Sequence, residues 1–159
     1  MDAGRPKTYA DSMVLERLRL WIVGIIVLGL IGTMTDLVLL EHDEKAHQFV
    51  PLVLMELGAV TLAWHAMAKS TASLRSLQIV MGLFVLSGFA GMAAHFNGSM
   101  EYQLELNPDL SMAELLDKII HAKAPPLLAP GMMIQMGLLG LAYAYTDLRY
   151  RRSDCHVGI

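Results

Sequence analysis

Four apolar runs, each long enough to cross a lipid bilayer, constrain this sequence more than any other feature. They extend over about residues 18–40, 49–68, 77–94 and 127–145. A membrane-spanning helix needs roughly 17–25 mostly apolar residues. Of the 159 residues, 55% are hydrophobic and only 17% are charged, as is typical of membrane proteins. We therefore predict an all-α integral membrane protein in which four spans form an antiparallel helix bundle, a single domain over residues 1–159.

The basic residues predict how the spans are oriented. All but three of the 12 Lys and Arg residues lie before or at the very start of span one, between spans two and three, or after span four, and the exceptions are Lys45, Lys118 and Lys123. Because Lys and Arg concentrate in cytoplasmic loops, we expect both termini in the cytoplasm, as in a bacterial inner-membrane protein. The first run is too long for a cleavable signal peptide, so we expect it to remain in the mature chain.

The longest connection, residues 95–126, is predicted to lie on the outer side of the membrane. Residues 97–108 alternate apolar and polar side chains, a strand-like pattern. A helix would instead stack Glu101 over Glu105, so both structures stay open. Ser111 and Glu114 then form the pattern of a capping box. We expect an extracytoplasmic amphipathic helix to follow it, between spans three and four, on the membrane surface.

Three polar side chains within the apolar runs form the first candidate site. They are Asp36, Glu56 and Gln135. Helix rise places Asp36 and Glu56 each roughly 8 Å below the outer end of its span, and Gln135 lies near the same level. If all three face inward they form one buried polar layer, in which two carboxyl groups share a proton. Such a pair suits a proton or cation step, and the alternative is a polar contact that fixes helix register.

Histidines and acids near the outer surface form the second candidate site, for a metal ion. The candidate ligands are His42, His47, His95, His121, Glu101 and Glu105. Imidazole and carboxylate groups together suit zinc or copper(II), but the spacing matches no recognised metal motif. An ordinary wetted surface is the competing interpretation. Haem b would require His95 together with His42 or His121, and the methionines suit packing better than copper(I) binding.

Several residues near the predicted cytoplasmic ends of the spans are expected to mark the membrane interface. Arg19 is expected to anchor span one at the lipid headgroups, His65 to be interfacial, and tyrosines of span four to form an aromatic belt. These tyrosines are Tyr143, Tyr145 and Tyr150.

The sequence shows no Ser-His-Asp or Cys-His arrangement, no phosphate-binding glycine loop and no basic surface for nucleic acid. These absences argue for a non-enzyme. We expect a small membrane binding or accessory protein in the lipid bilayer, as a subunit of a larger complex or a homo-oligomer, whose outer His and acid residues meet a cation or a partner. The alternatives are a proton-coupled transporter that uses Asp36 and Glu56, and a haem- or quinone-linked redox subunit.

Overall fold

The computed structural model describes the backbone of residues 9–39, 49–121 and 128–157, and the side chains of residues 13–39, 49–121 and 128–147. This part of the chain forms five helices, α1 (Tyr9–Leu39), α2 (Phe49–Ala68), α3 (Thr71–Leu106), α4 (Met112–Ile120) and α5 (Leu128–Val157). All except α4 are long and apolar enough to span a membrane. The prediction of an all-α, multi-pass membrane protein is therefore confirmed.

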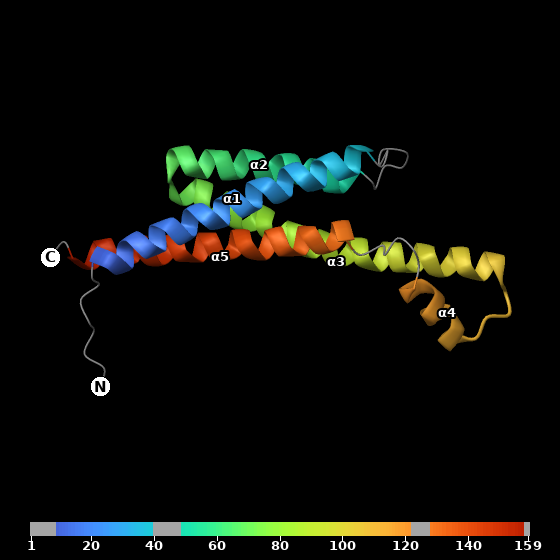
Figure 1. Ribbon diagram of the computed structural model, residues 1–159. Helices are drawn as coiled ribbons and strands as arrows, with labels where there is room; N and C mark the ends of the chain where they lie inside the picture. Colours follow the sequence, from blue (N-terminus) through green and yellow to red (C-terminus); the bar gives the residue numbers. More distant parts are fainter. Residues whose placement is uncertain (1–8, 40–48, 122–127, 158–159) are drawn as a thin grey trace, which may run out of the picture.

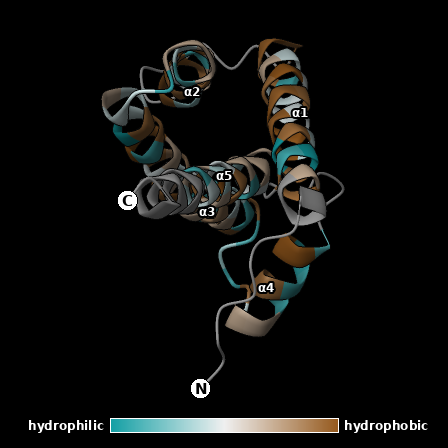
Figure 2. Ribbon diagram, turned by 90° about the vertical axis from the view of Figure 1, so that its left-hand side faces the viewer, coloured by the Kyte–Doolittle hydropathy of each residue, from teal (hydrophilic) through white to brown (hydrophobic). Residues whose placement is uncertain are grey.

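The four long helices form an antiparallel bundle. Helix α3 packs against α2 and α5, and α1 packs against the same two helices. Figure 1 shows α3 and α5 running side by side while α1 crosses obliquely from the C-terminal part of α5 to the N-terminal part of α2. In the end-on view of Figure 2, α2 lies above the α3–α5 pair and α1 lies to its right. We call the end of the bundle that holds the α2–α3 turn the turn end, and the opposite end the α4 end.

Local sequence explains where the helices begin and how α2 turns into α3. Pro51 and Pro130 each lie in the first turn of their helix, where the missing N–H of proline costs nothing. Lys69 takes a left-handed backbone conformation, with φ 44°. Ser70 then caps α3 in a reciprocal capping box with Ser73. Two residues therefore suffice to reverse the chain between α2 and α3.

The core is built from apolar side chains of all four long helices around Phe84 of α3, which is fully buried. A β-carbon added at Gly58 of α2 would come within 2.8 Å of the Phe84 ring, and within 3.6 Å of Leu30 of α1. Glycine at this position therefore makes room for the aromatic ring. Methionines from three helices fill the space around it, Met55, Met81, Met133 and Met136, in keeping with their adaptable shape.

Glycines allow α3 and α5 to approach closely. A β-carbon on Gly137 of α5 would come within 2.7 Å of the Met81 carbonyl oxygen, and one on Gly88 of α3 within 2.8 Å of the Pro130 carbonyl oxygen. This confirms the packing role predicted for small residues in spans three and four. In span one, a β-carbon added at Gly29 would come within 2.8 Å of the Met136 sulfur. One added at Gly24 or Gly32 would have no neighbouring atom within 4 Å.

Helix α3 continues far beyond the third apolar run and resolves the ambiguity over residues 97–108. Its 36 residues correspond to about 54 Å, longer than the roughly 30 Å hydrocarbon core of a bilayer. Figure 1 shows α3 projecting past the other long helices, with α4 beside the projection. The alternating pattern is thus helical up to Leu106.

Helix α4 has the predicted amphipathic character and capping box. Leu115 and Ile119 are buried, and α4 packs against α3. The hydroxyl and backbone N–H of Ser111 both donate to the Glu114 carboxylate, and these hydrogen bonds lower the pKa of Glu114. The position of α4 relative to a membrane surface stays a prediction.

Candidate functional site

The best-developed polar site of the described bundle is centred on Asp147 of α5, at the turn end. Asp147 is only 6% exposed. The guanidinium group of Arg19, from α1, donates a hydrogen bond to its Oδ1 atom. The imidazole Nε2 atom of His65, from α2, lies 3.6 Å from its Oδ2 atom. A buried carboxylate is stable only when paired, and here Asp147 is paired across the bundle.

His65 connects this carboxylate to the α2–α3 turn. Its ring is 1% exposed, and its Nδ1 atom lies 3.0 Å from the hydroxyl oxygen of Ser73 in α3. A neutral ring protonated at Nε2 would point its N–H toward Asp147 and accept from Ser73, whereas a doubly protonated ring would donate toward both. The Ser73 hydroxyl also belongs to the capping box with Ser70. The Ser73 hydroxyl therefore contacts both His65, near the end of α2, and the capping residue of α3, Ser70.

Tyr143 covers the network on the side of α5. The Arg19 guanidinium lies 5.1 Å from the centre of its ring, a cation–π contact. The rings of His65 and Tyr143 meet edge to face with centroids 6.0 Å apart. Together these five residues, which we call the Asp147 network, come from all four long helices: Arg19, His65, Ser73, Tyr143 and Asp147.

The structure corrects the expectations for three members of this network. His65 and Tyr143 are buried inside the bundle rather than exposed on its surface, and the depth of His65 in the membrane stays a prediction. Tyr145 is exposed, as a belt requires, and the side chain of Tyr150 lies outside the described residues. Arg19 pairs with a buried acid, which the anchoring role did not anticipate.

Asp147 was missed altogether, although the sequence carries a signal for it. Buried residues of α5 recur at alternating intervals of three and four, and Asp147 continues that series. The series is Met133, Met136, Gly140, Tyr143 and Asp147. A carboxylate that continues the spacing of the core-facing residues of a helix is expected to face the core as well.

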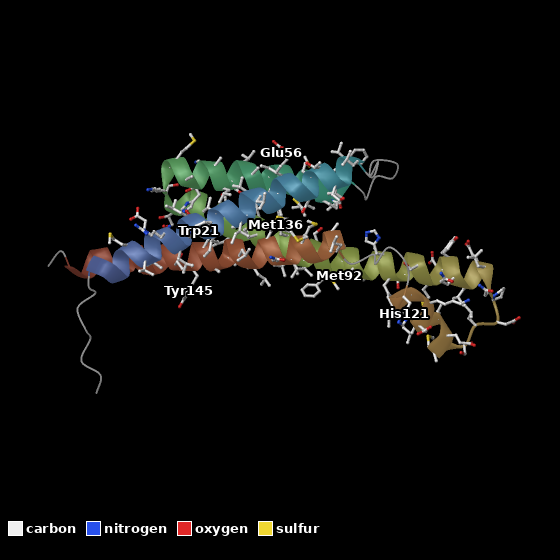
Figure 3. The ribbon with its side chains drawn as sticks, viewed as in Figure 1. Trp21, Glu56, Met92, His121, Met136 and Tyr145 are labelled. Carbon is white, nitrogen blue, oxygen red and sulfur yellow. The ribbon has the colours of Figure 1, made fainter. Side chains whose placement is uncertain are left out.

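The predicted polar layer at the α4 end is not seen inside the bundle. Asp36, Glu56 and Gln135 are all exposed. Among the residues that the structure describes, no hydrogen bond or ion pair joins them to one another. Figure 3 shows Glu56 on the side of α2 that faces away from the other long helices. The structure therefore differs from the prediction in the direction of these three side chains, which point outward rather than into the bundle.

The predicted metal ligands do not come together in the described part of the chain. His42 and His47 lie outside the described residues. Glu101 and Glu105 are exposed on the projecting part of α3, and His95 is exposed on the same helix. His121 contacts the Asp117 carboxylate at 3.1 Å, at the end of α4 (Figure 3). Among the described side chains, those of residues 13–39, 49–121 and 128–147, no three from His, Cys, Asp or Glu are grouped as metal ligands.

An open apolar groove of about 540 Å³ runs between α2 and α3 in the half of the bundle nearer the α4 end. Its walls carry the hydroxyl of Ser87 and otherwise apolar side chains, namely Phe49, Val50, Val53, Leu54, Leu83, Leu86 and Ala90. A wide opening and an apolar lining are what a membrane-facing surface of a bundle presents to lipid.

Comparisons with known proteins find no matching family model, no similar curated protein and no similar solved structure.

Proposed function

We propose that this protein is an accessory subunit of a membrane complex that binds another transmembrane helix through the outward face of α2. The observation that carries the proposal is the exposed Glu56 carboxyl group within a spanning helix. The proposal keeps the binding role expected from sequence and moves it from the outer loops to the spans.

The position of Glu56 makes a lipid environment costly. Glu56 lies seven residues after the first residue of α2, Phe49, or roughly 10 Å along the helix. The buried residues of α2 lie on the opposite side, for example Met55, Gly58 and Leu62. Placing an ionised side chain in the bilayer core costs on the order of 3 kcal/mol or more. A partner that hydrogen-bonds Glu56 would offset that cost.

Gln135 of α5 supports the wider part of the proposal, that other protein surrounds part of this bundle. It lies seven residues after Leu128, the first residue of α5, and is exposed like Glu56. Amide side chains in membrane helices usually hydrogen-bond across helices. Asp36, also exposed, lies near the C-terminal end of α1. Polar groups on outward faces are expected of a subunit surrounded partly by protein rather than wholly by lipid.

The accessory role accounts for these residues better than the transporter alternative does. A proton-coupled carrier based on Asp36 and Glu56 needs the two carboxyl groups on a shared pathway, and both are exposed. The side chains packed at the centre of the bundle are apolar, such as Phe84 and Met136. A cation or redox role would rest on His42 and His47 as well as His95, so it stays a secondary proposal.

Photocrosslinking in native membranes tests the proposed role. A photoreactive residue replaces Val60, which is 53% exposed and lies one turn from Glu56, or Ile79 of α3, which is 65% exposed. The two are matched in depth, because Val60 lies eight residues before the end of α2 and Ile79 eight residues after the start of α3. We expect a discrete protein adduct from position 60 and only lipid adducts from position 79. Lipid adducts alone from position 60 would contradict the proposal.

A further inference from the structure

We propose that the turn end of the bundle binds the headgroups of anionic phospholipids through Arg17 of α1 and Arg75 of α3. Both side chains are exposed. This surface is separate from the outward face of α2, so the proposed accessory function does not depend on it. Two features of the turn end support the assignment, namely its exposed aromatic side chains and its distribution of charge.

Exposed aromatic side chains on three helices lie at the level of the Asp147 network. They are Trp21, Trp64 and Tyr145, which are 72%, 44% and 58% exposed, and we call them the turn-end aromatics. Each lies within two residues of a network member on its own helix, or at most about 3 Å along the helix axis. Figure 3 shows Tyr145 projecting from α5 on the side away from α2. Because exposed Trp and Tyr rings concentrate at the headgroup level of a membrane, the turn-end aromatics indicate that this end lies at a lipid–water interface.

Arg17 extends this surface outward along α1. It lies four residues before Trp21, and residues four apart share one face of a helix. Both side chains are exposed. Helix α1 runs from the turn end toward the α4 end (Figure 1), so Arg17 is attached about 6 Å farther out than Trp21. A single lipid can therefore place its acyl chain against the indole ring and its phosphate group against the guanidinium group.

Arg75 repeats this arrangement on α3. It lies four residues before Ile79 on the same face, and Ile79 is 65% exposed. Arg75 is also only two residues after Ser73, a member of the Asp147 network, so it is attached close to the level of the turn-end aromatics. A long basic side chain at this level extends along the helix surface until its charged group reaches the headgroups.

Arg19, which the sequence predicted as a headgroup anchor, is engaged within the bundle instead. Its guanidinium group donates to the Asp147 carboxylate and lies over the Tyr143 ring. The side chain is only 19% exposed, and Asp147 balances its charge. Lipid phosphates at the turn end must therefore be met by other basic residues.

The charges of the described side chains favour anionic lipids at the turn end. Apart from the Arg19–Asp147 pair, that end carries three exposed basic residues and one exposed acid, namely Arg17, Lys69, Arg75 and Glu16. Residues 95–121, toward the α4 end, instead carry five acids and one lysine, namely Glu101, Glu105, Asp109, Glu114, Asp117 and Lys118. Basic residues near a membrane surface attract anionic lipids over about a Debye length. Anionic lipids should therefore collect at the turn end and not at the α4 end.

Tryptophan fluorescence tests the proposal, because both tryptophans of the chain belong to the turn-end aromatics. The pure full-length chain is reconstituted in mixed vesicles of phosphatidylcholine and phosphatidylglycerol, with bromine on the acyl chains of one lipid or the other. The quenching by each brominated lipid gives their relative affinity at this surface, whichever way the chain inserts. We expect phosphatidylglycerol to be favoured about 3- to 10-fold, and less so at high salt.

Single substitutions test the two arginines. Arg17→Gln and Arg75→Gln should each lower the preference for phosphatidylglycerol about 2-fold or more, and the double variant should bring it close to one. Lys118→Gln removes the same charge from α4 and is the matched control, which should keep the preference of the parent chain. In a Trp64→Phe chain, where Trp21 alone reports, Arg17→Gln should have the larger effect, since Arg17 shares a face with Trp21. Circular dichroism checks that each variant keeps its helices.

Three results would overturn the proposal. Equal quenching by the two lipids in the parent chain would show that the turn end does not select anionic headgroups. An unchanged preference in the double variant would show that Arg17 and Arg75 do not bind them. A loss in Lys118→Gln as large as that in either arginine variant would show an effect of net charge rather than of this surface.

Discussion

Asp147 links three of the long helices through contacts of its side chain. Its carboxylate contacts Arg19 from α1 and His65 from α2, two helices that lie far from α5 along the chain. Both partners are partly or fully shielded from solvent, with Arg19 19% exposed and His65 1% exposed. Because the site is largely dry, removal of one charge leaves another uncompensated.

A double-mutant cycle tests this role of Asp147. We expect Arg19→Met and Asp147→Leu each to lower the free energy of unfolding by about 3–5 kcal/mol, because each leaves an ionised group in the core. The double variant should lose clearly less than the sum of the two, since neither charge remains. Unfolding in a detergent titration, followed by circular dichroism, supplies the measurement. Strictly additive losses would show that the two residues act independently.

At the residue scale, sequence predicted position along a helix but not direction around it. Helix rise and topology place Asp36, Glu56 and Gln135 in the spans, as the structure has them. Which side of α2 faces the core depends on contacts such as Gly58 with Phe84, which no local pattern reveals. The Arg19–Asp147 pair was similarly hidden, because its members lie 128 residues apart.

At the scale of the helices, close contact between α3 and α5 is the main packing feature. Gly137 sits where any β-carbon would meet the backbone of α3 at Met81 and Val85. A side chain at this point cannot be accommodated by rotating a neighbouring side chain. The two helices would have to separate.

Alanine substitution tests this packing with a control on the partner helix. Gly137→Ala should lower the free energy of unfolding by about 1–3 kcal/mol through overpacking. Gly82→Ala should leave stability unchanged or slightly higher, because nothing lies within 4 Å of that position and alanine favours helix. Both are measured in the same detergent titration. Equal effects of the two substitutions would contradict close packing at Gly137.

The sequence was most informative about elements with a complete local signal. The Ser111–Glu114 capping box and the amphipathic pattern after it correctly predicted α4. The segment from residue 97 to residue 106 was ambiguous because a period of two and a helical stacking of acids fit it equally well. The segment is helical because it continues α3, and adding residues to a helix that has already formed costs little free energy.

At the scale of the whole molecule, the start of α1, the α2–α3 turn and the end of α5 lie together at the turn end (Figure 1). The charge pattern predicts that this end is cytoplasmic. Because Cys155 is the single cysteine, an impermeant thiol reagent can report the side on which it lies. We expect Cys155 to be labelled only after the cells are opened, and Gln103→Cys, in a Cys155→Ser chain, to be labelled in intact cells. The reverse result would invert the topology.

The proposed function requires that another protein helix covers the outward face of α2. A spin label at Val60→Cys, in a Cys155→Ser chain held in native membranes, tests this requirement through its collision rate with dissolved oxygen, which concentrates in lipid. The matched position Ile79→Cys lies at the same depth on the exposed face of α3. We predict markedly lower oxygen accessibility at position 60 than at position 79. Equal accessibility at the two positions would show that lipid covers α2, and would contradict the proposed function.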